Sequence, residues 1–310
     1  MDTRFVVLYA TRLFSLLFLS FFRCRDLGLH RLDFELFPDS TQPMNSSREH
    51  IAGEAIDDLV RPAFQRDGYV VVRGLCDKVL CNEMREQILA SLDPLIGPAE
   101  FETDVGYPGA PSSRDVFGGD TPRRLLHAYA RHSAFRGWAG GCEVKSYLSA
   151  LLDDQDVCLS QSHHNCVMTK NPGYSSATLW HQDIRYWSFD VPELISVWLA
   201  LGDENSSNGA LKVIPGTHVL EIERGRLDRD LFLRPELSEN RQLIRQAVSI
   251  DLAIGDVLFF HCRLFHAAGK NRSDEVKLSS VFTYHTGANK PIPGTRSAQY
   301  PSVPVRPDSP

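Results

Sequence analysis

The sequence predicts a mainly β protein with flanking α-helices, and three observations lead to this prediction. Short runs of strand-forming residues recur at near-regular spacing between residues 157 and 284, with Asn, Pro and Gly turn residues between them. Apolar residues at helical spacing lie mostly before residue 157. A His-x-Asp sequence, His181 to Asp183, lies inside one of the strand-like runs. We therefore expect a β core with N-terminal helices packed on one sheet.

The first 43 residues differ from the rest. Residues 5–22 are strongly apolar, but the charge-free part, residues 13–22, is shorter than the roughly 20 residues that a bilayer span needs. It resembles the apolar region of a signal peptide, yet no small-x-small cleavage site follows it. We expect residues 1–43 to be an extension outside the fold, either a leader or a translated upstream segment. The remainder, 44–310, is then a single domain with a core at about 157–288.

The N-terminal part of that domain carries helical patterns. Residues 51–60 have helical apolar spacing, and Pro62 predicts a break. Residues 64–74 then fit a helix end, an Asp-Gly turn and a β-branched strand. Residues 97–122 are rich in Gly, Pro, Ser and Asp and predict a loop, which is either disordered or a lid over a site. Further helices are predicted over residues 76–92, 123–139 and 142–152.

The β core follows. Asn208-Gly209 is a hairpin signal, and a polar insertion at residues 220–245 is expected to be helical. Short strands divided by turns indicate a sandwich or a jelly roll. The double-stranded β-helix, the cupin type of jelly roll, fits well because it places the strand of His181 next to a late strand. The expected strands cover residues 159–170, 177–181, 194–201, 210–214, 248–252, 257–260 and 277–284.

Composition excludes some function classes. A formal net charge of −6, without a Lys/Arg stripe, argues against a nucleic-acid partner. The seven cysteines are an odd number, form no CxxC motif and suit a reducing compartment, so we expect a cytoplasmic protein without a stable membrane span.

The His181-Gln182-Asp183 segment indicates the chemistry. In a strand, residues two apart point to the same face, so the imidazole and the carboxylate can reach one point. A third histidine would complete the two-histidine, one-carboxylate triad of non-haem Fe(II) oxygenases. His266 is the best candidate, and His261 is its rival.

At this point the chain resembles the phytanoyl-CoA dioxygenase family, which includes ectoine hydroxylases. The resemblance covers about residues 60 to 290 and comes as blocks in the same order. These blocks are residues 64–74, Lys170 to Gly173 with Trp180 to Asp183, 197–201, 208–211 with Ile214 to His218, and 255–261 followed by His266 and Asn271.

The resemblance implies an Fe(II)- and 2-oxoglutarate-dependent dioxygenase that uses O2, releases succinate and CO2, and accepts ascorbate as a possible reductant. His181, Asp183 and His266 would hold the metal, with no catalytic residue beyond these ligands. An arginine usually binds the distal carboxylate of 2-oxoglutarate, but the matching residue here is Lys277, which supplies the charge without the planar fork. Arg272 could compete for that role.

Four further positions match the co-substrate pocket of relatives: Lys170, Trp198, Asn165 and Gln161. The alternative is that Trp198 is simply core and that Asn165 satisfies a backbone group. His218 is expected to be structural, and His163 and His164 are left unassigned.

The predicted function is hydroxylation of a small organic molecule or acyl conjugate. Related halogenases replace the carboxylate ligand with a small residue, so Asp183 argues against halogenation. A cupin-like metal-binding protein that does not use 2-oxoglutarate is the alternative, because Lys277 departs from the family pattern. A non-catalytic binding module is a third hypothesis, against which the three metal-ligand candidates count. The sequence leaves the substrate and the oligomeric state open.

Overall fold

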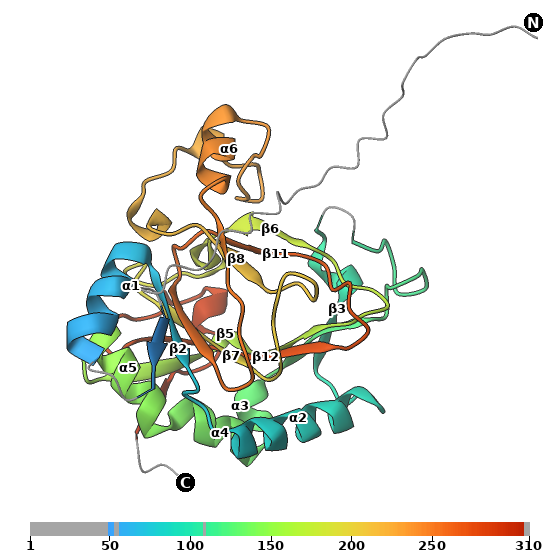
Figure 1. Ribbon diagram of the computed structural model, residues 1–310, viewed down its shortest axis with the longest axis horizontal. Helices are drawn as coiled ribbons and strands as arrows, with labels where there is room; N and C mark the ends of the chain where they lie inside the picture. The colour runs from blue at the N-terminus through green and yellow to red at the C-terminus, as the bar shows by residue number, and fades with distance from the viewer. Residues whose placement is uncertain (1–48, 53–55, 108–109, 307–310) are drawn as a thin grey trace, which may run out of the picture. The chain divides into compact units, whose positions relative to one another are not determined.

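The computed structural model describes residues 49–52, 56–107 and 110–306, and the expectations for residues 1–43 lie outside this part of the chain. The described residues belong to one compact unit, in which two β-sheets face each other (Figure 1). The strands are β1 (Glu49–Ile51), β2 (Tyr69–Arg73), β3 (Ala99–Phe101), β4 (Pro122–Leu126), β5 (Val157–Lys170), β6 (Thr178–His181), β7 (Ile195–Ala200), β8 (Leu211–Val213), β9 (Val248–Ser249), β10 (Val257–His261), β11 (His266–Ala268), β12 (Lys277–Thr286) and β13 (Val303–Pro304).

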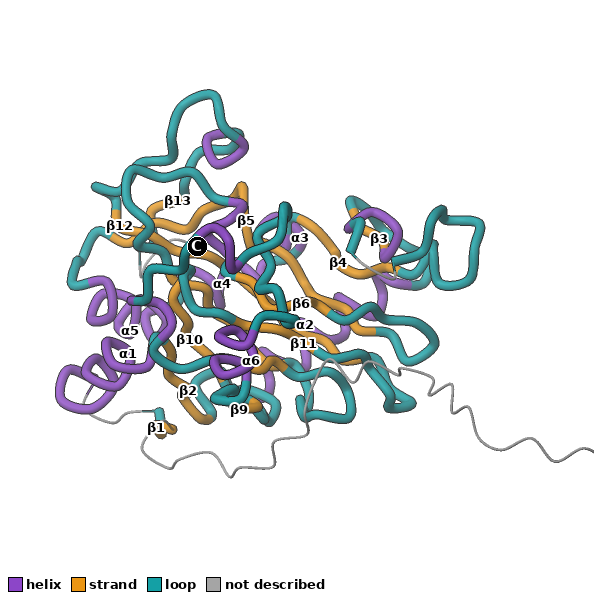
Figure 2. The backbone as a smooth tube through the Cα atoms, turned by 90° about the horizontal axis from the view of Figure 1, so that it is seen from above, coloured by secondary structure: helices purple, strands orange, loops and turns teal. Residues whose placement is uncertain are grey.

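The larger sheet has nine strands in the order β1-β2-β10-β7-β12-β5-β4-β3, with β13 also paired to β5. The smaller sheet has the order β6-β11-β8-β9, and Figure 2 shows β6 beside β11. The double-stranded β-helix predicted from the sequence is confirmed. In β12, Phe282 pairs with Asn165 but Thr283 pairs with Ser160, so residues 161–164 of β5 form a bulge.

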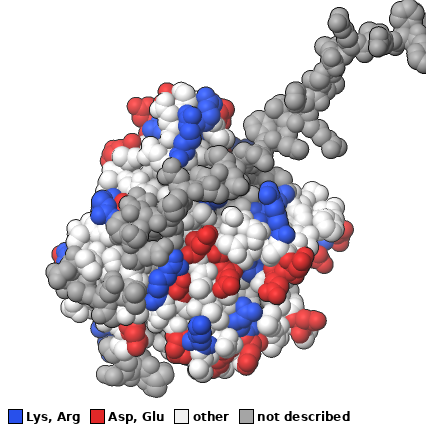
Figure 3. Space-filling model, in the orientation of Figure 1, with Lys and Arg blue, Asp and Glu red and all other residues white. Residues whose placement is uncertain are grey.

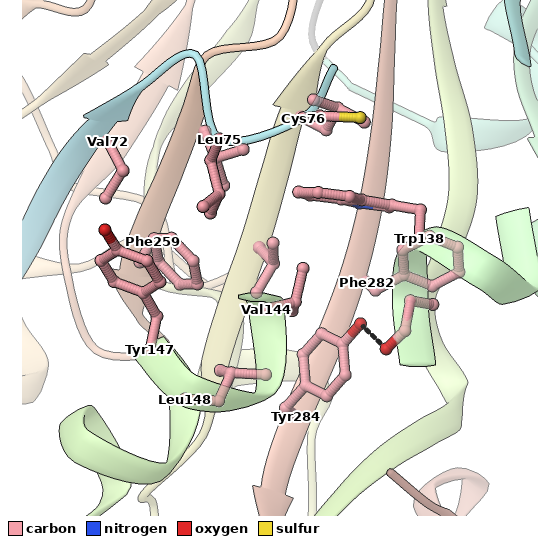
Figure 4. Packing of buried hydrophobic residues seen from close by; sticks show 14 of the residues in the cluster. Val72, Leu75, Cys76, Trp138, Val144, Tyr147, Leu148, Phe259, Phe282 and Tyr284 are labelled. Carbon is pink, nitrogen blue, oxygen red and sulfur yellow. Dashed lines mark hydrogen bonds between the residues drawn. The ribbon is translucent and has the colours of Figure 1, made fainter. Parts of the chain in front are cut away.

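Five of the six α-helices cover the outer face of the larger sheet, whereas the helix Ser238–Ile244 lies on the side of the smaller sheet, where Ile244 packs with Trp180 and Ala267 (Figure 1). Val197 and Leu199 of β7 point toward the helices of the outer face, whereas Trp198 and Ala200 point between the sheets, as strand alternation requires. Figure 4 shows the helix side of this packing, where the Tyr284 hydroxyl donates to the carbonyl of Ala139 at 2.8 Å. The helices are α1 (Arg61–Asp67), α2 (Lys78–Leu92), α3 (Ala128–Arg131), α4 (Ser133–Gly140), α5 (Cys142–Leu152) and α6 (Ser238–Ile244), with a π-helical turn at Ile56–Val60.

Several local predictions need correction. Pro62 does not break a helix; it lies in the first turn of α1, where its missing N–H is not needed. The helix predicted over residues 123–139 begins instead as strand β4, because pairing with β5 overrides the helix preference of Arg and Leu. The predicted loop 97–122 contains β3 and the 3-10 turn η3 (Glu102–Val105). The insertion 220–245 is helical only in the short η6 (Arg224–Arg226) and α6.

On the face that Figure 3 shows, acidic and basic side chains are intermingled over the described residues. Among the described residues, none of the helices has the length and apolar character to cross a bilayer.

Candidate metal centre and the interior behind it

The three predicted metal ligands meet between the two sheets. His181 ends β6 and His266 begins β11, and the two are direct partners in the antiparallel pair. Side chains of such partners lie side by side, and these rings have centroids 4.3 Å apart. Asp183 follows at the start of the 3-10 turn η4 (Asp183–Tyr186). One ligand atom from each residue lies within 4.8 Å of the other two.

Both imidazoles are held in the orientation that a metal requires. Nδ1 of His181 bonds to the carbonyl of Leu179 at 2.8 Å, and Nδ1 of His266 bonds to the carbonyl of Leu264 at 3.0 Å. Because a carbonyl only accepts, each Nδ1 carries a proton, which leaves Nε2 as the ligand atom of the neutral ring. These Nε2 atoms lie 3.7 Å and 3.5 Å from Oδ1 of Asp183. The donor set is thus two imidazole nitrogens and one carboxylate oxygen on one side of a shared point.

Burial and mutual contact set the protonation states. Burial lowers the pKa of His181 well below its usual value, and His266 lowers it further. Burial alone would raise the pKa of Asp183, but His164, His266 and His181 together hold it below the usual value. Burial would lower the pKa of His266, and Asp183 more than offsets this, so that pKa is raised. At neutral pH the carboxylate is therefore ionised and His181 neutral, as metal ligation requires.

Asp183 is also fixed from behind. The Ser196 hydroxyl donates to Oδ2 of Asp183 at 3.2 Å, and Nδ1 of His164 lies 3.5 Å from the same oxygen. His164 comes from the bulge of β5, which turns it toward the triad. The sequence left His164 unassigned and gave no signal for Ser196, because only the folded sheet brings them to Asp183.

We call the triad the metal end of the interior. Its other part, the lysine end, consists of Lys277, Ser279, Glu204 and Trp198. Ser196, which bonds to Asp183, and Trp198 share the inner face of β7, so the two ends lie along the same face of that strand.

At the lysine end, the predicted co-substrate cation already has a partner. Nζ of Lys277 lies 2.9 Å from Oε2 of Glu204, and both side chains are at most 2% exposed. Oε1 of the same carboxylate accepts hydrogen bonds from Ser279 Oγ at 2.6 Å and Trp198 Nε1 at 3.0 Å. Sequence reasoning missed Glu204. It lies in the β7–β8 connection, 73 residues before Lys277, and nothing in its neighbourhood marks it as buried.

The other predicted pocket residues divide into two groups. Lys170 faces the interior, pairs with Lys277 across β5 and β12, and donates to the carbonyls of Ser176 at 3.0 Å and Gly269 at 2.6 Å. Burial lowers the pKa of Lys170 well below its usual value. Asn165 points to the helix side, where its Oδ1 accepts from the backbone N–H of Tyr129 at 2.8 Å. Gln161 donates to the carbonyl of Pro301 at 2.7 Å, so the structure brings neither amide to the triad.

The rival candidates lie elsewhere. His261 uses Nε2 for Glu193 at 3.0 Å and accepts from the backbone N–H of Arg263 at its Nδ1, so both of its nitrogens are engaged away from the triad. His218 contacts the carbonyl of Gln65 at 3.2 Å. Arg272 is exposed in the connection between β11 and β12, whereas Lys277 is buried between the sheets.

Comparison with known proteins gives a family match. The family model described as phytanoyl-CoA dioxygenase (PhyH) matches residues 64–279. Among curated proteins, phytanoyl-CoA dioxygenase 1 of Oryza sativa subsp. japonica is 23% identical over 246 residues, which are 72% of this chain and 86% of that protein.

Solved structures share the fold. EctD from S. alaskensis, solved with 2-oxoglutarate and 5-hydroxyectoine, aligns with a TM-score of 0.61 at 18% identity, over 83% of this chain and 89% of that one. The epimerase SnoN, solved with Fe3+, alpha ketoglutarate and nogalamycin RO, aligns with a TM-score of 0.59 at 20% identity, over 76% and 84%. At sequence identities this low, the similarity establishes that the chain shares the jelly-roll architecture of these proteins, and it does not establish a shared reaction.

Proposed function

Because this chain belongs to the phytanoyl-CoA dioxygenase family, it is an Fe(II)- and 2-oxoglutarate-dependent dioxygenase, and we propose that it hydroxylates a small organic molecule or acyl conjugate at the buried triad. The observation that carries the proposal is the convergence of three ligand atoms from β6, η4 and β11 within 4.8 Å.

The residues present fit a metal of this type. His181, Asp183 and His266 would hold it on one side and leave the other side free for small ligands. When bound, Fe(II) and 2-oxoglutarate supply oxidising power, because decarboxylation of the oxo acid to succinate and CO2 is coupled to transfer of an oxygen atom from O2 to the substrate. The protein itself holds each imidazole by its Nδ1–H and each Asp183 oxygen by its neighbours, and its apolar walls exclude water.

At the other end of the interior, we propose that Lys277 meets the distal carboxylate of 2-oxoglutarate, with Trp198 and Lys170 beside it. The burial of Lys277 and the exposure of Arg272 support this choice. Glu204 is then a competitor for the same ammonium group. The intact Asp183 supports hydroxylation over halogenation, since a halide would need the coordination position that this carboxylate takes.

We also propose a cytoplasmic location. The cysteines among the described residues are all free thiols, which supports a reducing compartment.

The test measures succinate from 2-oxoglutarate, with Fe(II), ascorbate and a panel of candidate substrates, on the full chain. We expect substrate-dependent succinate that disappears in Asp183→Ala. Substrate-dependent oxidation without consumption of 2-oxoglutarate would instead support the metal protein that does not use it. A product that has the mass of the substrate but an inverted stereocentre would show that the reaction is an epimerisation and not a hydroxylation.

A further inference from the structure

An arginine lies above the metal end between two aromatic rings. Arg185 belongs to η4, two residues after Asp183. Its guanidinium carbon lies 3.8 Å from the ring centroid of Phe232 and 4.5 Å from that of Tyr186. Both rings also flank His181, with centroids 5.8 Å and 6.4 Å from the imidazole. The guanidinium is therefore positioned beside one of the proposed metal ligands.

Arg185 lacks the acidic partner that Arg123, Arg124 and Lys277 possess. Its NH1 nitrogen is buried and makes no hydrogen bond within the described residues. No carboxylate of that part of the chain lies within 4.0 Å of it. A buried nitrogen without a partner costs free energy, and a charged one costs more. By contrast, Arg123 pairs with Glu102 at 3.2 Å, Arg124 with Glu100 at 3.3 Å and Lys277 with Glu204 at 2.9 Å.

Two distant segments converge to cover the arginine. Tyr107 comes from the stretch after η3, and Phe232 comes from the insertion between β8 and β9. Their rings meet edge to face with centroids 5.5 Å apart. The Tyr107 and Tyr186 hydroxyls lie 3.4 Å from each other, so Tyr107 contacts both of the aromatic residues that flank the guanidinium. We call Arg185, Tyr107, Tyr186 and Phe232 the arginine cap.

The arginine cap combines a guanidinium group that has no acidic partner with the apolar faces of aromatic rings. A guanidinium matches the geometry of a carboxylate or a phosphate and binds either through two parallel hydrogen bonds. Stacking between rings holds the fork in place, so less conformational entropy is lost on binding. The aromatic faces of Phe232 and Tyr186 can receive an apolar portion of the same ligand next to His181.

We propose that Arg185 binds an anionic oxygen group, a carboxylate or a phosphate, on the primary substrate and thereby aims the adjacent carbon skeleton at the triad. This inference rests on the proposed function and names the substrate class of the same site. The site selects acids and phosphate esters over their neutral analogues, and the arginine is a binding residue separate from the lysine end.

The test measures equilibrium binding to the full chain loaded with Ni(II) and 2-oxoglutarate without oxygen, so that no turnover is needed. The probes are phenylacetate, octanoate and phenyl phosphate, with phenylacetamide and octanamide as neutral matches. The native protein should bind at least one acid about 10- to 100-fold more tightly than its neutral match, as a charge-assisted hydrogen bond predicts. Arg185→Gln should abolish that preference, and Arg185→Lys should restore part of it. The relative affinity for phenylacetate and phenyl phosphate decides which anion the site prefers.

Arg229→Gln is the matched control, because the Arg229 side chain is 92% exposed and should leave every affinity unchanged. Equal binding of acids and amides by the native protein, or an unchanged preference in Arg185→Gln, overturns the inference. So does a loss of 2-oxoglutarate affinity in Arg185→Gln, which would assign the arginine to the co-substrate. If the acid preference holds while no succinate forms with any substrate, the proposed function fails and the anion site stands.

Discussion

The metal end and the lysine end share one interior but differ in how their charges are arranged. At the metal end, two imidazoles and a carboxylate point their free lone pairs at a common point, and backbone carbonyls and Ser196 hold them from behind. At the lysine end, the charge of Lys277 is already matched by Glu204 at 2.9 Å. The donor atoms of the metal end are therefore arranged to bind a cation, whereas the cation of the lysine end is already paired with a carboxylate of the same chain.

This difference shows what a motif can reveal. The three proposed metal ligands were predicted to meet from the His-x-Asp spacing and from the family spacing that favours His266 over His261, and their ligand atoms do lie within 4.8 Å of one another. Lys277 could also be recognised from the sequence. Whether its ammonium group is free to bind 2-oxoglutarate could not be predicted, because that depends on Glu204, which comes from another segment of the chain. A motif thus identifies which side chain can bind a ligand, but it does not show which other residue of the protein already contacts that side chain.

The largest expected effect comes from removing a ligand at the metal end. His266→Ala leaves one imidazole and one carboxylate, so we expect loss of stoichiometric Fe(II) binding and of succinate formation. Metal content after dialysis and coupled succinate release are the measurements. His261→Asn is the matched control and should keep full metal stoichiometry, since His261 bonds to Glu193 and lies outside the triad. Retained metal in His266→Ala together with loss in His261→Asn would reverse the assignment.

The sequence made the fold predictable where patterns were local. Strand β10 was recognisable by its continuous apolar run, and β12 by the strand-forming residues Val281 to Tyr284. The change from helical spacing to short strand-like runs near Val157 marked the start of the β core. Strand β4 was not predicted from the sequence, because Pro122–Leu126 contains no β-branched residue and its Arg and Leu residues favour a helix in isolation. Its pairing with β5 is a tertiary effect that no window of sequence contains.

The site was predictable to the same degree. His181 and Asp183 were recognised by their spacing, and His266 was preferred to His261 because it fits the spacing of the family that the chain resembles. Asn165 was misplaced because the β5 bulge, which decides which face each residue takes, has no sequence signature. Arg185 and Phe232 could be named as neighbours only once the 220–245 insertion was seen to fold back over η4.

The second prediction concerns stability at the lysine end. Lys277→Met leaves the Glu204 carboxylate buried without its partner, which should cost about 3 to 5 kcal/mol of unfolding free energy. The double variant Lys277→Met/Glu204→Gln should recover most of this loss, because no uncompensated charge remains. Urea unfolding measures both. The exposed pair Arg234–Glu236 is the control, and Glu236→Gln should change stability by at most about 1 kcal/mol. A double variant as unstable as the single one would show that packing, rather than charge, explains the loss.

The third prediction concerns pH and His163, which lies in the β5 bulge next to His164 and bonds to the Ser297 hydroxyl at 2.7 Å. Burial, together with His164 and Arg296, lowers the pKa of His163 to about 3. The unfolded chain binds this proton near the usual value of about 6.5, so between those two values the unfolded state holds more protons and stability falls as pH falls. His163→Asn should therefore reduce the stability lost between pH 7 and pH 5 by about 1 to 2 kcal/mol. Urea unfolding of both proteins at the two pH values is the measurement, and identical losses would contradict the assignment of His163 as a buried neutral group.

The smallest expected effect concerns the affinity for 2-oxoglutarate, which we propose binds at both the metal end and the lysine end. If Lys277 binds the distal carboxylate of 2-oxoglutarate, Glu204 must yield that ammonium group when the co-substrate enters. Glu204→Gln keeps the shape and removes the competing charge, so 2-oxoglutarate should bind about fivefold more tightly, which corresponds to roughly 1 kcal/mol. The affinity is measured by calorimetry on Ni(II)-loaded protein without oxygen, and Ni(II) affinity serves as the internal control because the triad is untouched. Weaker binding in Glu204→Gln would mean that Glu204 positions Lys277 for the co-substrate instead of competing with it. An unchanged affinity in both Glu204→Gln and Lys277→Met would place the distal carboxylate away from this pair, and the lysine end would then be a structural ion pair behind a working metal centre.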